Sequence, residues 1–424
     1  MKLAVFTSTY PARVATFFER DMRGLIAAGV SLDIFAVAPL DAQRWQYSLG
    51  ILGEDVLPRR QVHHLGFGTS VLQLRPWPLE RAAAFGREVR AITASAARFG
   101  LVPLLKTAYV VPKAWSWARD HAEGYDQVLA YWGNYAGTCA YLYHRLSGRS
   151  VPFSIWLHAG TDLYRTQVFL REKLLYADSI LTCCAFNRTF LTEHYPDIAP
   201  ALSAKTAVCY HGLDLAEFPY RAEGRPLATV LAVGALGRGK GFPYLLHAAK
   251  ELARRGIAIT VQFAGDGEER GLLERLAREL GIADRVRFLG WLKFPDVRKA
   301  MSEATMLVHP SDGLGDGLPN VLREAMALGT PVVASDVAGI PEALDHGRCG
   351  VLVPPKDVGA LADAIELLLQ DPNRRRELAE RGRRHTELKF DLWKNGAWLA
   401  QHLGALRRRG PDPKAALTPT AARC

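Results

Sequence analysis

The chain has few cysteines and no long apolar run, and these shortages exclude several classes of protein. Its six cysteines, among 424 residues, show no Cys-x-x-Cys spacing, which argues against a disulfide framework and suits a reducing cytosol. The most apolar stretch, residues 101–112, is interrupted by Lys106 and two prolines, so we expect no membrane span. The first residues, MKLAVFTSTYP, lack the apolar length and cleavage site of a secretory signal. We therefore expect a cytoplasmic protein.

Signatures of dinucleotide, metal and nucleic-acid binding are also missing. Residues 7–22 follow the first expected strand without a Gly-x-Gly-x-x-Gly turn. Asp312 and Asp316 stand where a calcium loop has its first and fifth ligands, but Leu314 and Arg323 occupy its third and twelfth positions. Because no Asp-x-Asp element ends a strand either, we expect no metal and no cofactor. The net charge of +10 favours anionic substrates or acidic lipid, and no motif for nucleic acid accompanies it.

Strand and helix patterns alternate in both halves of the chain, which is typical of parallel α/β sheets. The expected strands are residues 3–7, 31–37, 127–132, 152–158, 179–184 and 206–211, and then 229–234, 258–265, 285–290, 306–310, 331–335 and 350–354. A polar break at 224–228 separates the two series. We expect two doubly wound, Rossmann-like domains facing a cleft, at 1–223 and 224–403, with a last helix that crosses back and a disordered tail at 404–424.

Residues 308–342 predict a strand, a glycine-broken loop, a helix and another strand. The helix should begin at Leu318 or Pro319, since proline tolerates the first helical position. Its free amides and positive helix end would favour a diphosphate without any metal. Glu324, one to two turns into this helix, could bond a ligand hydroxyl, so Asp316 and Glu324 would frame one site.

Asp316, seven intervening residues and Glu324, ahead of AMALGTPVVAS, resemble the donor-sugar motif of family 4 retaining glycosyltransferases, which are glycosyl transferases of group 1. The resemblance is to members of the exopolysaccharide and colanic acid type, and it implies the two-domain GT-B fold. In that family the residue matching Glu324 holds the ribose of a nucleotide sugar, and the residue matching Asp316 faces the transferred sugar. Glutamate is commoner at the first position, and Asp316 is shorter by one methylene.

The resemblance extends to further turns at strand ends, in VGALGRGKGF (233–242), AGDGEER (264–270) and FLGWL (288–292). It implies donor contacts from Arg238, Lys240, Gly241, Gly265, Trp291, Gly317, Leu318, Pro319 and Asn320. The chain departs from the family at Ala235, where arginine is usual, and at Ala338, where a second glycine is usual. Two alternatives stay open, because Gly265 could serve only its turn and Trp291 could be a core cap.

In the first half, WLHAGTDLYR (156–165) resembles the family's His-Gly-x-Asp segment. This match implies that His158 contacts the donor sugar and that Asp162 orients the loop. We expect a structural role for His211, while His309 could serve either purpose. Glu342 is expected to cap or brace its own loop. Residues 14–17 lack the serine and glutamate of the family, so the acceptor is the least readable partner.

Residues 72–119 combine arginines and lysines with large apolar side chains. Such helices fit an anionic lipid surface, and the alternative is an exposed helical pair with a buried aromatic side. The reading that accounts for most residues is a retaining, metal-independent glycosyltransferase. It would move a sugar from a UDP- or GDP-linked donor to a glycan or lipid-linked acceptor in bacterial surface polysaccharide synthesis, and it would lie peripherally at the inner face of the membrane. The rivals are a sugar-nucleotide epimerase of the same fold and a catalytically silent protein that binds a sugar nucleotide or a membrane.

Overall fold

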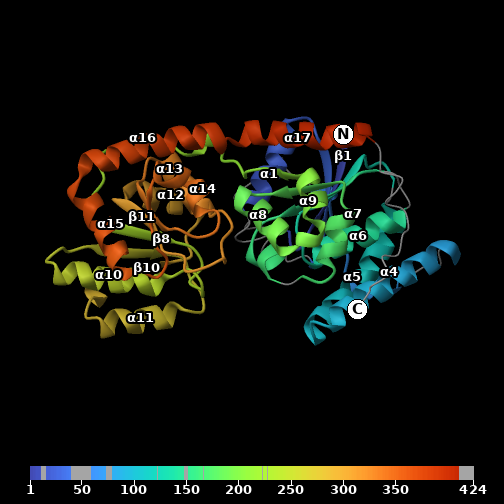
Figure 1. Cartoon of the computed structure of the whole chain (residues 1–424), viewed down its shortest axis with the longest axis horizontal. Helices are drawn as coiled ribbons and strands as arrows, with labels where there is room; N and C mark the ends of the chain where they lie inside the picture. Colours follow the sequence, from blue (N-terminus) through green and yellow to red (C-terminus); the bar gives the residue numbers. More distant parts are fainter. Residues whose placement is uncertain are drawn as a thin grey trace. The chain divides into compact units, whose positions relative to one another are not determined.

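The computed structural model describes residues 1–10, 16–39, 59–72, 79–121, 123–147, 151–165, 167–221, 223–226 and 228–409. The chain forms two compact units (Figure 1). Unit 1 comprises Met1–Cys183, Asn187–Cys209 and the chain from Gly396, and unit 2 comprises Cys184–Phe186 and Tyr210–Asn395. The chain thus changes unit between Cys209 and Tyr210, before the predicted boundary at 223/224.

Each unit is built on one parallel sheet, as the alternation of strands and helices predicts. In unit 1 the strand order is β3-β2-β1-β4-β5-β6-β7, and in unit 2 it is β10-β9-β8-β11-β12-β13. The strands are β1 (Lys2–Thr7), β2 (Ser31–Ala36), β3 (Val62–His64), β4 (Gln127–Ala130), β5 (Phe153–Leu157), β6 (Ser179–Thr182), β7 (Thr206–Val208), β8 (Thr229–Val233), β9 (Thr260–Ala264), β10 (Val286–Gly290), β11 (Met306–His309), β12 (Val332–Ser335) and β13 (Val351–Val353). All predicted strands are present, and β3 was not predicted. The fold class is confirmed.

Helices connect the strands and cover the sheets (Figure 1). The early helices are α1 (Thr16–Ala27), α3 (Phe67–Leu72), α4 (Leu79–Ala97), α5 (Leu101–Asp120), α6 (Tyr135–Ser147), α7 (Leu170–Tyr176), α8 (Ala185–His194) and α9 (Ala199–Lys205). The later ones are α10 (Phe242–Arg254), α11 (Arg270–Glu279), α12 (Phe294–Glu303), α13 (Asn320–Ala327), α14 (Ile340–Ala343), α15 (Val358–Gln370), α16 (Pro372–Lys389) and α17 (Leu392–Arg409). None of the helices in the described part of the chain is long and apolar enough to cross a membrane.

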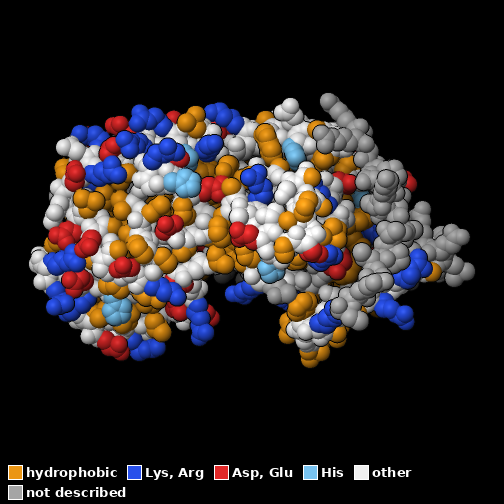
Figure 2. Space-filling view, in the orientation of Figure 1, with side chains coloured by type: hydrophobic (Ala, Val, Ile, Leu, Met, Phe, Trp, Pro, Cys, Tyr) orange, Lys and Arg blue, Asp and Glu red, His pale blue; other side chains and the backbone are white. Residues whose placement is uncertain are grey.

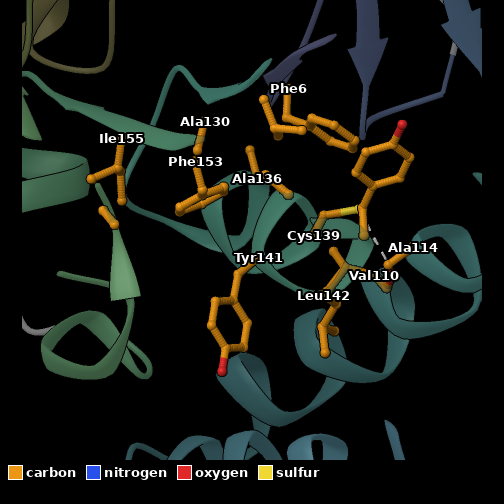
Figure 3. Packing of buried hydrophobic residues seen from close by; sticks show 14 of the residues in the cluster. Phe6, Val110, Ala114, Ala130, Ala136, Cys139, Tyr141, Leu142, Phe153 and Ile155 are labelled. Carbon is orange, nitrogen blue, oxygen red and sulfur yellow. Dashed lines mark hydrogen bonds between the residues drawn. The ribbon is translucent and has the colours of Figure 1, made fainter. Parts of the chain in front are cut away.

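The sheet of unit 1 is buried on both faces. Because successive side chains of a strand point to opposite sides, each strand contributes to two core clusters. On β1, Ala4 and Phe6 belong to one core cluster, while Leu3 and Val5 belong to another. Figure 3 shows Cys139 of α6 beside Val110 of α5, where the thiol donates to the Val110 carbonyl in the same cluster as Phe6. The strands therefore read as nearly continuous apolar runs.

The last helix, α17, completes the second of these cores. Its Leu399 and Leu403 are buried with Leu25 of α1. A Cβ atom added to Gly396 would lie 2.6 Å from Gly24, so the helices α1 and α17 cross through two glycines. The assignment of residues from Gly396 onward to unit 1 agrees with a last helix that returns to the first domain. Residues 404–409, predicted as disordered tail, are instead helical, and 410–424 lie outside the described residues.

Candidate functional site

Turns at the carboxyl ends of β8, β9 and β11 pack tightly against one another in unit 2. Gly241 precedes α10 with φ of 67°, and an added Cβ atom would lie 1.7 Å from the carbonyl oxygen of Pro310. Gly265 is equally close to the turn after β8, because its added Cβ atom would lie 1.9 Å from the oxygen of Gly234. Only glycine fits at these positions. Packing of the turns therefore explains both glycines without a ligand, and it fixes where Lys240 lies.

Lys240, His309 and Asp316 form one polar cluster at these strand ends. The Lys240 ammonium donates to Oδ1 and Oδ2 of Asp316, at 2.6 and 2.7 Å. Nε2 of His309, the last residue of β11, lies 3.1 Å from Asp316 Oδ2. Lys240 and Asp316 are 76 residues apart in the sequence. The structure thus brings together the predicted phosphate-binding lysine and the first residue of the acidic motif, and it adds His309 to them.

The electrostatics of this cluster keep Asp316 ionised. Burial alone would raise the pKa of Asp316, but the hydrogen bond from His309 and the charge of Lys240 lower it well below its usual value. Because a carboxylate only accepts, Nε2 of His309 must carry the proton of this bond. His309 is only 1 % exposed, and its Nδ1 has no hydrogen-bond partner among the described residues. The Nδ1 atom of the ring is thus a buried polar atom beside the ion pair of Lys240 with Asp316.

Helix α13 begins at Asn320, slightly later than predicted. Pro319 has ψ of 130°, which is extended backbone, so it precedes the helix and does not open it. Asn320 accepts a hydrogen bond from Arg323, whose guanidinium also donates to the carbonyl of His211. That contact is made by the His211 backbone, and the structural role of its side chain stays a prediction. Glu324 is 5 % exposed on α13, in the same unit as Asp316 and Lys240.

The remaining predicted donor residues divide into exposed and buried ones. Arg238 is exposed on the turn before Lys240, and Trp291 is 54 % exposed after β10. A core-cap role for Trp291 is therefore wrong. Leu318 and Pro319 are buried, and the carbonyl of Gly317 accepts from the amide of Gly339 at 2.9 Å.

Ala338 has a backbone conformation that usually belongs to glycine. Its φ is 50°, in the left-handed region, which is unfavourable for a residue with a Cβ atom. The family resemblance described above implies a glycine at this position. The chain therefore keeps the turn that precedes α14 while losing the residue that normally forms it.

Glu342 acts on a different segment from the one expected. Instead of bracing its own loop, its carboxylate accepts from the backbone amides of Ala185, at 2.8 and 2.9 Å, and Phe186, at 3.3 Å, and from the hydroxyl of Tyr210. Negative charge at a helix N-terminus is stabilising. Glu342 therefore caps α8 from a position 157 residues away in the sequence.

In unit 1, His158 follows β5 and is buried among aromatic rings. Its ring centroid lies 4.5 Å from that of Trp132 and 4.7 Å from that of Tyr131. Asp162 accepts from the backbone amides of His158 and Ala159 and lies 3.3 Å from His158 Nδ1. The expected role of Asp162 in orienting the loop is confirmed.

Lys173 is a positioning residue that the sequence did not reveal. Its buried ammonium donates to the carbonyl of Gly133 at 2.6 Å and to the hydroxyl of Thr138 at 3.1 Å. Asp162 accepts from the amide of the same Gly133. Lys173 therefore holds the turn after β4 against the His158 loop. A lysine within the apolar pattern LREKLL was the available signal.

Comparison with known proteins places these observations in a family. Residues 221–385 match the family model of glycosyl transferases group 1. Alpha-D-kanosaminyltransferase of Streptomyces kanamyceticus is 36 % identical over 181 residues, which are 43 % of this chain and 46 % of that protein. A lipopolysaccharide core biosynthesis glycosyltransferase, LpsE of Rhizobium meliloti, is 36 % identical over 154 residues, which are 36 % of this chain and 43 % of that protein. The chain spans about half the length of the curated relatives it matches.

Solved structures resemble nearly the whole chain. Sucrose-phosphate synthase from Thermosynechococcus elongatus has a TM-score of 0.71 at 21 % identity and covers 96 % of this chain and 100 % of its own. Anabaena HepE, solved with UDP-glucose, has a TM-score of 0.68 at 19 % identity and covers 95 % of this chain and 99 % of its own. Both have the fold built from two Rossmann-like domains. Residues 221–385 therefore belong to the glycosyl transferases group 1 family, and the chain has the GT-B fold.

Proposed function

We propose that this chain is a cytoplasmic, retaining glycosyltransferase. It would move a sugar from a UDP- or GDP-linked donor to a glycan or lipid-linked acceptor, without a metal, in bacterial surface polysaccharide synthesis. The observation that carries the proposal is the ion pair of Lys240 with Asp316, next to His309, inside the segment that matches group 1 glycosyltransferases. The relative LpsE supports the polysaccharide role, since its name assigns it to lipopolysaccharide core biosynthesis.

The donor would occupy the strand-end turns of unit 2. Lys240, with Arg238 exposed beside it, supplies positive charge for the diphosphate, and the free amides at the start of α13 supply further donors. Glu324 would hold the ribose, and Asp316 would face the sugar. The turns at Gly265 and Trp291 would lie along the nucleoside. The structure of HepE with UDP-glucose, which has the same fold, supports a nucleotide sugar as ligand.

Retention of configuration follows in this proposal from attack on the face that the diphosphate leaves. Positive charge develops at the anomeric carbon as the bond to the diphosphate breaks, and Lys240 with the α13 amides stabilises the negative leaving group. A phosphate oxygen of this leaving group accepts the proton of the incoming hydroxyl. His158 of unit 1 would contact the donor sugar, and its aromatic surroundings fix the ring.

The experiment is to incubate the protein with UDP- and GDP-sugars and to measure donor hydrolysis and transfer. Glu324→Ala should lower kcat/KM by at least about tenfold, equal to about 1.4 kcal/mol. Glu279→Ala, at an exposed acidic residue on α11, is the matched control and should leave the rate unchanged. An epimerase would convert the donor sugar without any acceptor, and a silent binding protein would show no turnover. Either result, or full activity of Glu324→Ala, contradicts the proposal.

We further propose that the tip of the hairpin formed by α4 and α5 contacts an anionic membrane. Four large apolar side chains are exposed there, namely Phe99 at 43 %, Leu101 at 68 %, Val102 at 62 % and Leu105 at 59 %. Figure 2 shows apolar and basic side chains together at this tip. The exposed basic side chains Arg87, Arg90 and Lys106 lie on the same two helices, and Arg98 lies in the turn between them. Each contributes about 1 kcal/mol near an anionic surface.

The alternative reading of this segment is partly correct, because its aromatic side is buried. Trp117 is 3 % exposed, and the rings of Phe85 and Trp115 pack with centroids 4.9 Å apart. Trp77 lies outside the described residues. Co-sedimentation with vesicles that contain anionic lipid should retain the protein, and Leu101→Glu with Val102→Glu should abolish retention. Equal retention on neutral vesicles, or by the double variant, contradicts this membrane contact.

A further inference from the structure

A second cluster of reactive side chains lies in unit 2 outside the donor site. It consists of Asp345, in the turn after α14, Cys349, just before β13, and His385 of α16. One ligand atom from each residue lies within 4.8 Å of the other two. We propose that Asp345, Cys349 and His385 bind a zinc ion, with water in the fourth position. This cluster was not predicted from the sequence, because Asp345, Cys349 and His385 do not form a Cys-x-x-Cys, Asp-x-Asp or calcium-loop motif.

The backbone holds two of the three residues in place without a metal. The amides of Gly347 and Cys349 both donate to the carbonyl of Leu344, at 3.1 and 3.0 Å. Asp345 and His346 have φ of 49° and 54°, and two successive left-handed residues that are not glycine are uncommon. These hydrogen bonds and dihedral angles fix the turn, and the turn places Asp345 and Cys349 close to His385.

The imidazole and the thiol both suit a zinc ion. His385 Nε2 is buried and has no hydrogen-bond partner among the described residues. Zinc binds the lone pair of a neutral imidazole nitrogen. Cys349 is 3 % exposed, so its sulfur lies in the protein interior beside the other two ligands. Zinc would displace the thiol proton, which passes to solvent as the bond from sulfur to zinc forms.

Positively charged side chains surround the cluster, and the ligands must offset their charge before a cation can bind. The Arg348 guanidinium bonds both oxygens of Asp345, at 2.6 and 2.7 Å, but its side chain is 70 % exposed. It can release one oxygen to a metal and keep the other, as ligating carboxylates usually retain an outer hydrogen bond. The positive charges of Arg381 and Arg384 lie near Cys349, and that of Lys389 lies near His385. A thiolate and a carboxylate offset this positive field for zinc.

The ligand set also excludes the hard cations. Ca²⁺ needs six to eight oxygen ligands and Mg²⁺ prefers oxygen, whereas this cluster offers one carboxylate, one sulfur and one nitrogen. Zinc ligands at bond lengths of about 2.0 to 2.3 Å lie roughly 3.5 Å apart. The side chains must therefore approach by about 1 Å on binding. A bound ion would tie α16 to the turn that precedes β13.

The test uses the full chain, treated with chelator and then titrated with Zn²⁺ and, as a spectroscopic probe, Co²⁺. All variants carry Cys424→Ser, which removes a thiol outside the described residues. We expect one zinc per chain and a charge-transfer absorption from thiolate to Co²⁺. Cys349→Ser should abolish the absorption, and His385→Ala should weaken zinc binding at least about tenfold. His346→Ala is the matched control, since this exposed histidine is next to Asp345 but outside the cluster, and it should bind normally.

Unfolding of each apo variant shows whether the substitution merely disrupts the fold. Absence of saturable one-to-one zinc binding by the parent chain overturns the proposal, as does equal binding by Cys349→Ser and His385→Ala. Equal affinity for Mg²⁺ also overturns it. The readouts do not use sugar transfer, so the site and the proposed activity can fail separately.

Discussion

Replacing Asp316 with asparagine should strengthen the binding of UDP while lowering turnover of a UDP-sugar. In the described structure Asp316 holds Lys240 through two hydrogen bonds, so the lysine charge is neutralised before any donor arrives. Asparagine keeps the shape of the side chain but removes its charge. The lysine then becomes available to the diphosphate, and a negative neighbour that repels phosphate disappears. The transferred sugar, however, loses the carboxylate proposed to face it.

The magnitude follows from the charges and their exposure. Two unit charges about 4 Å apart interact by about 1 kcal/mol in water and about 4 kcal/mol at an effective dielectric constant of 20. The side chains of Lys240 and Asp316 are 25 % and 19 % exposed, so solvent screens them and the lower end of this range applies. A gain of about 1 to 2 kcal/mol corresponds to roughly 5- to 30-fold in the Kd for UDP. Lys240→Met should weaken UDP binding by a similar factor.

Isothermal titration calorimetry with UDP gives the affinities, and donor hydrolysis gives kcat/KM. Asp284→Asn, which removes a carboxylate from an exposed aspartate, controls for the change in net charge. High salt should reduce the gain, since these charges are partly exposed. If Asp316→Asn weakens UDP binding as Lys240→Met does, then the carboxylate does not compete with phosphate for the lysine, and this reasoning is refuted.

Three further predictions concern stability. Gly241→Ala should lower the free energy of unfolding by about 3 kcal/mol in urea titrations, because Gly241 has a positive φ and the Pro310 oxygen approaches it closely. The control Gly237→Ala, at a glycine with open space around it, should change this free energy by less than about 0.5 kcal/mol. Equal effects of the two substitutions would contradict the packing argument. Burial lowers the pKa of His144 from 6.5 to about 4, so the unfolded chain binds the proton first as pH falls. The free energy of unfolding should therefore decrease by about 3 kcal/mol between pH 6.5 and 4. In denaturation measured against pH, His144→Gln should reduce this dependence of stability on pH. Glu342→Gln should cost about 2 kcal/mol by weakening the charged cap of α8, measured by thermal unfolding, and an unchanged midpoint would remove this role.

Local patterns predicted the sheets, since apolar runs bounded by glycine and proline mark buried parallel strands. Strand β3 was missed because Val62–His64 contains two histidines and is too short to show a period. The start of α13 was misplaced at Leu318 or Pro319, since the tolerance of proline at a first helical position does not reveal that Pro319 is extended. In each case the error lies at an end or in a short element, where pattern carries least information.

The chemistry of the candidate site was predicted less completely than its position. Lys240 was named from a glycine-rich turn at a strand end, and Asp316 from the acidic motif that resembles the family's donor-sugar motif. It left His309 undecided, since its contact with Asp316 depends on how the loop after β11 folds back. The true partner of Glu342 could not be read from local sequence, because Ala185 is 157 residues away. A hydrogen bond between residues far apart in the sequence produces no periodic pattern in the sequence around either of them.

The glycine crossing between α1 and α17 has a consequence for synthesis on the ribosome. The first unit has almost all of its sequence once Cys209 has been translated, but Leu399 and Leu403 come roughly 190 residues later. At about 5 to 20 residues per second, roughly 10 to 40 seconds pass before they appear. During that interval the apolar surface beside α1 stays exposed to solvent. A nascent chain halted before Gly396 should therefore bind chaperones more strongly than the complete chain.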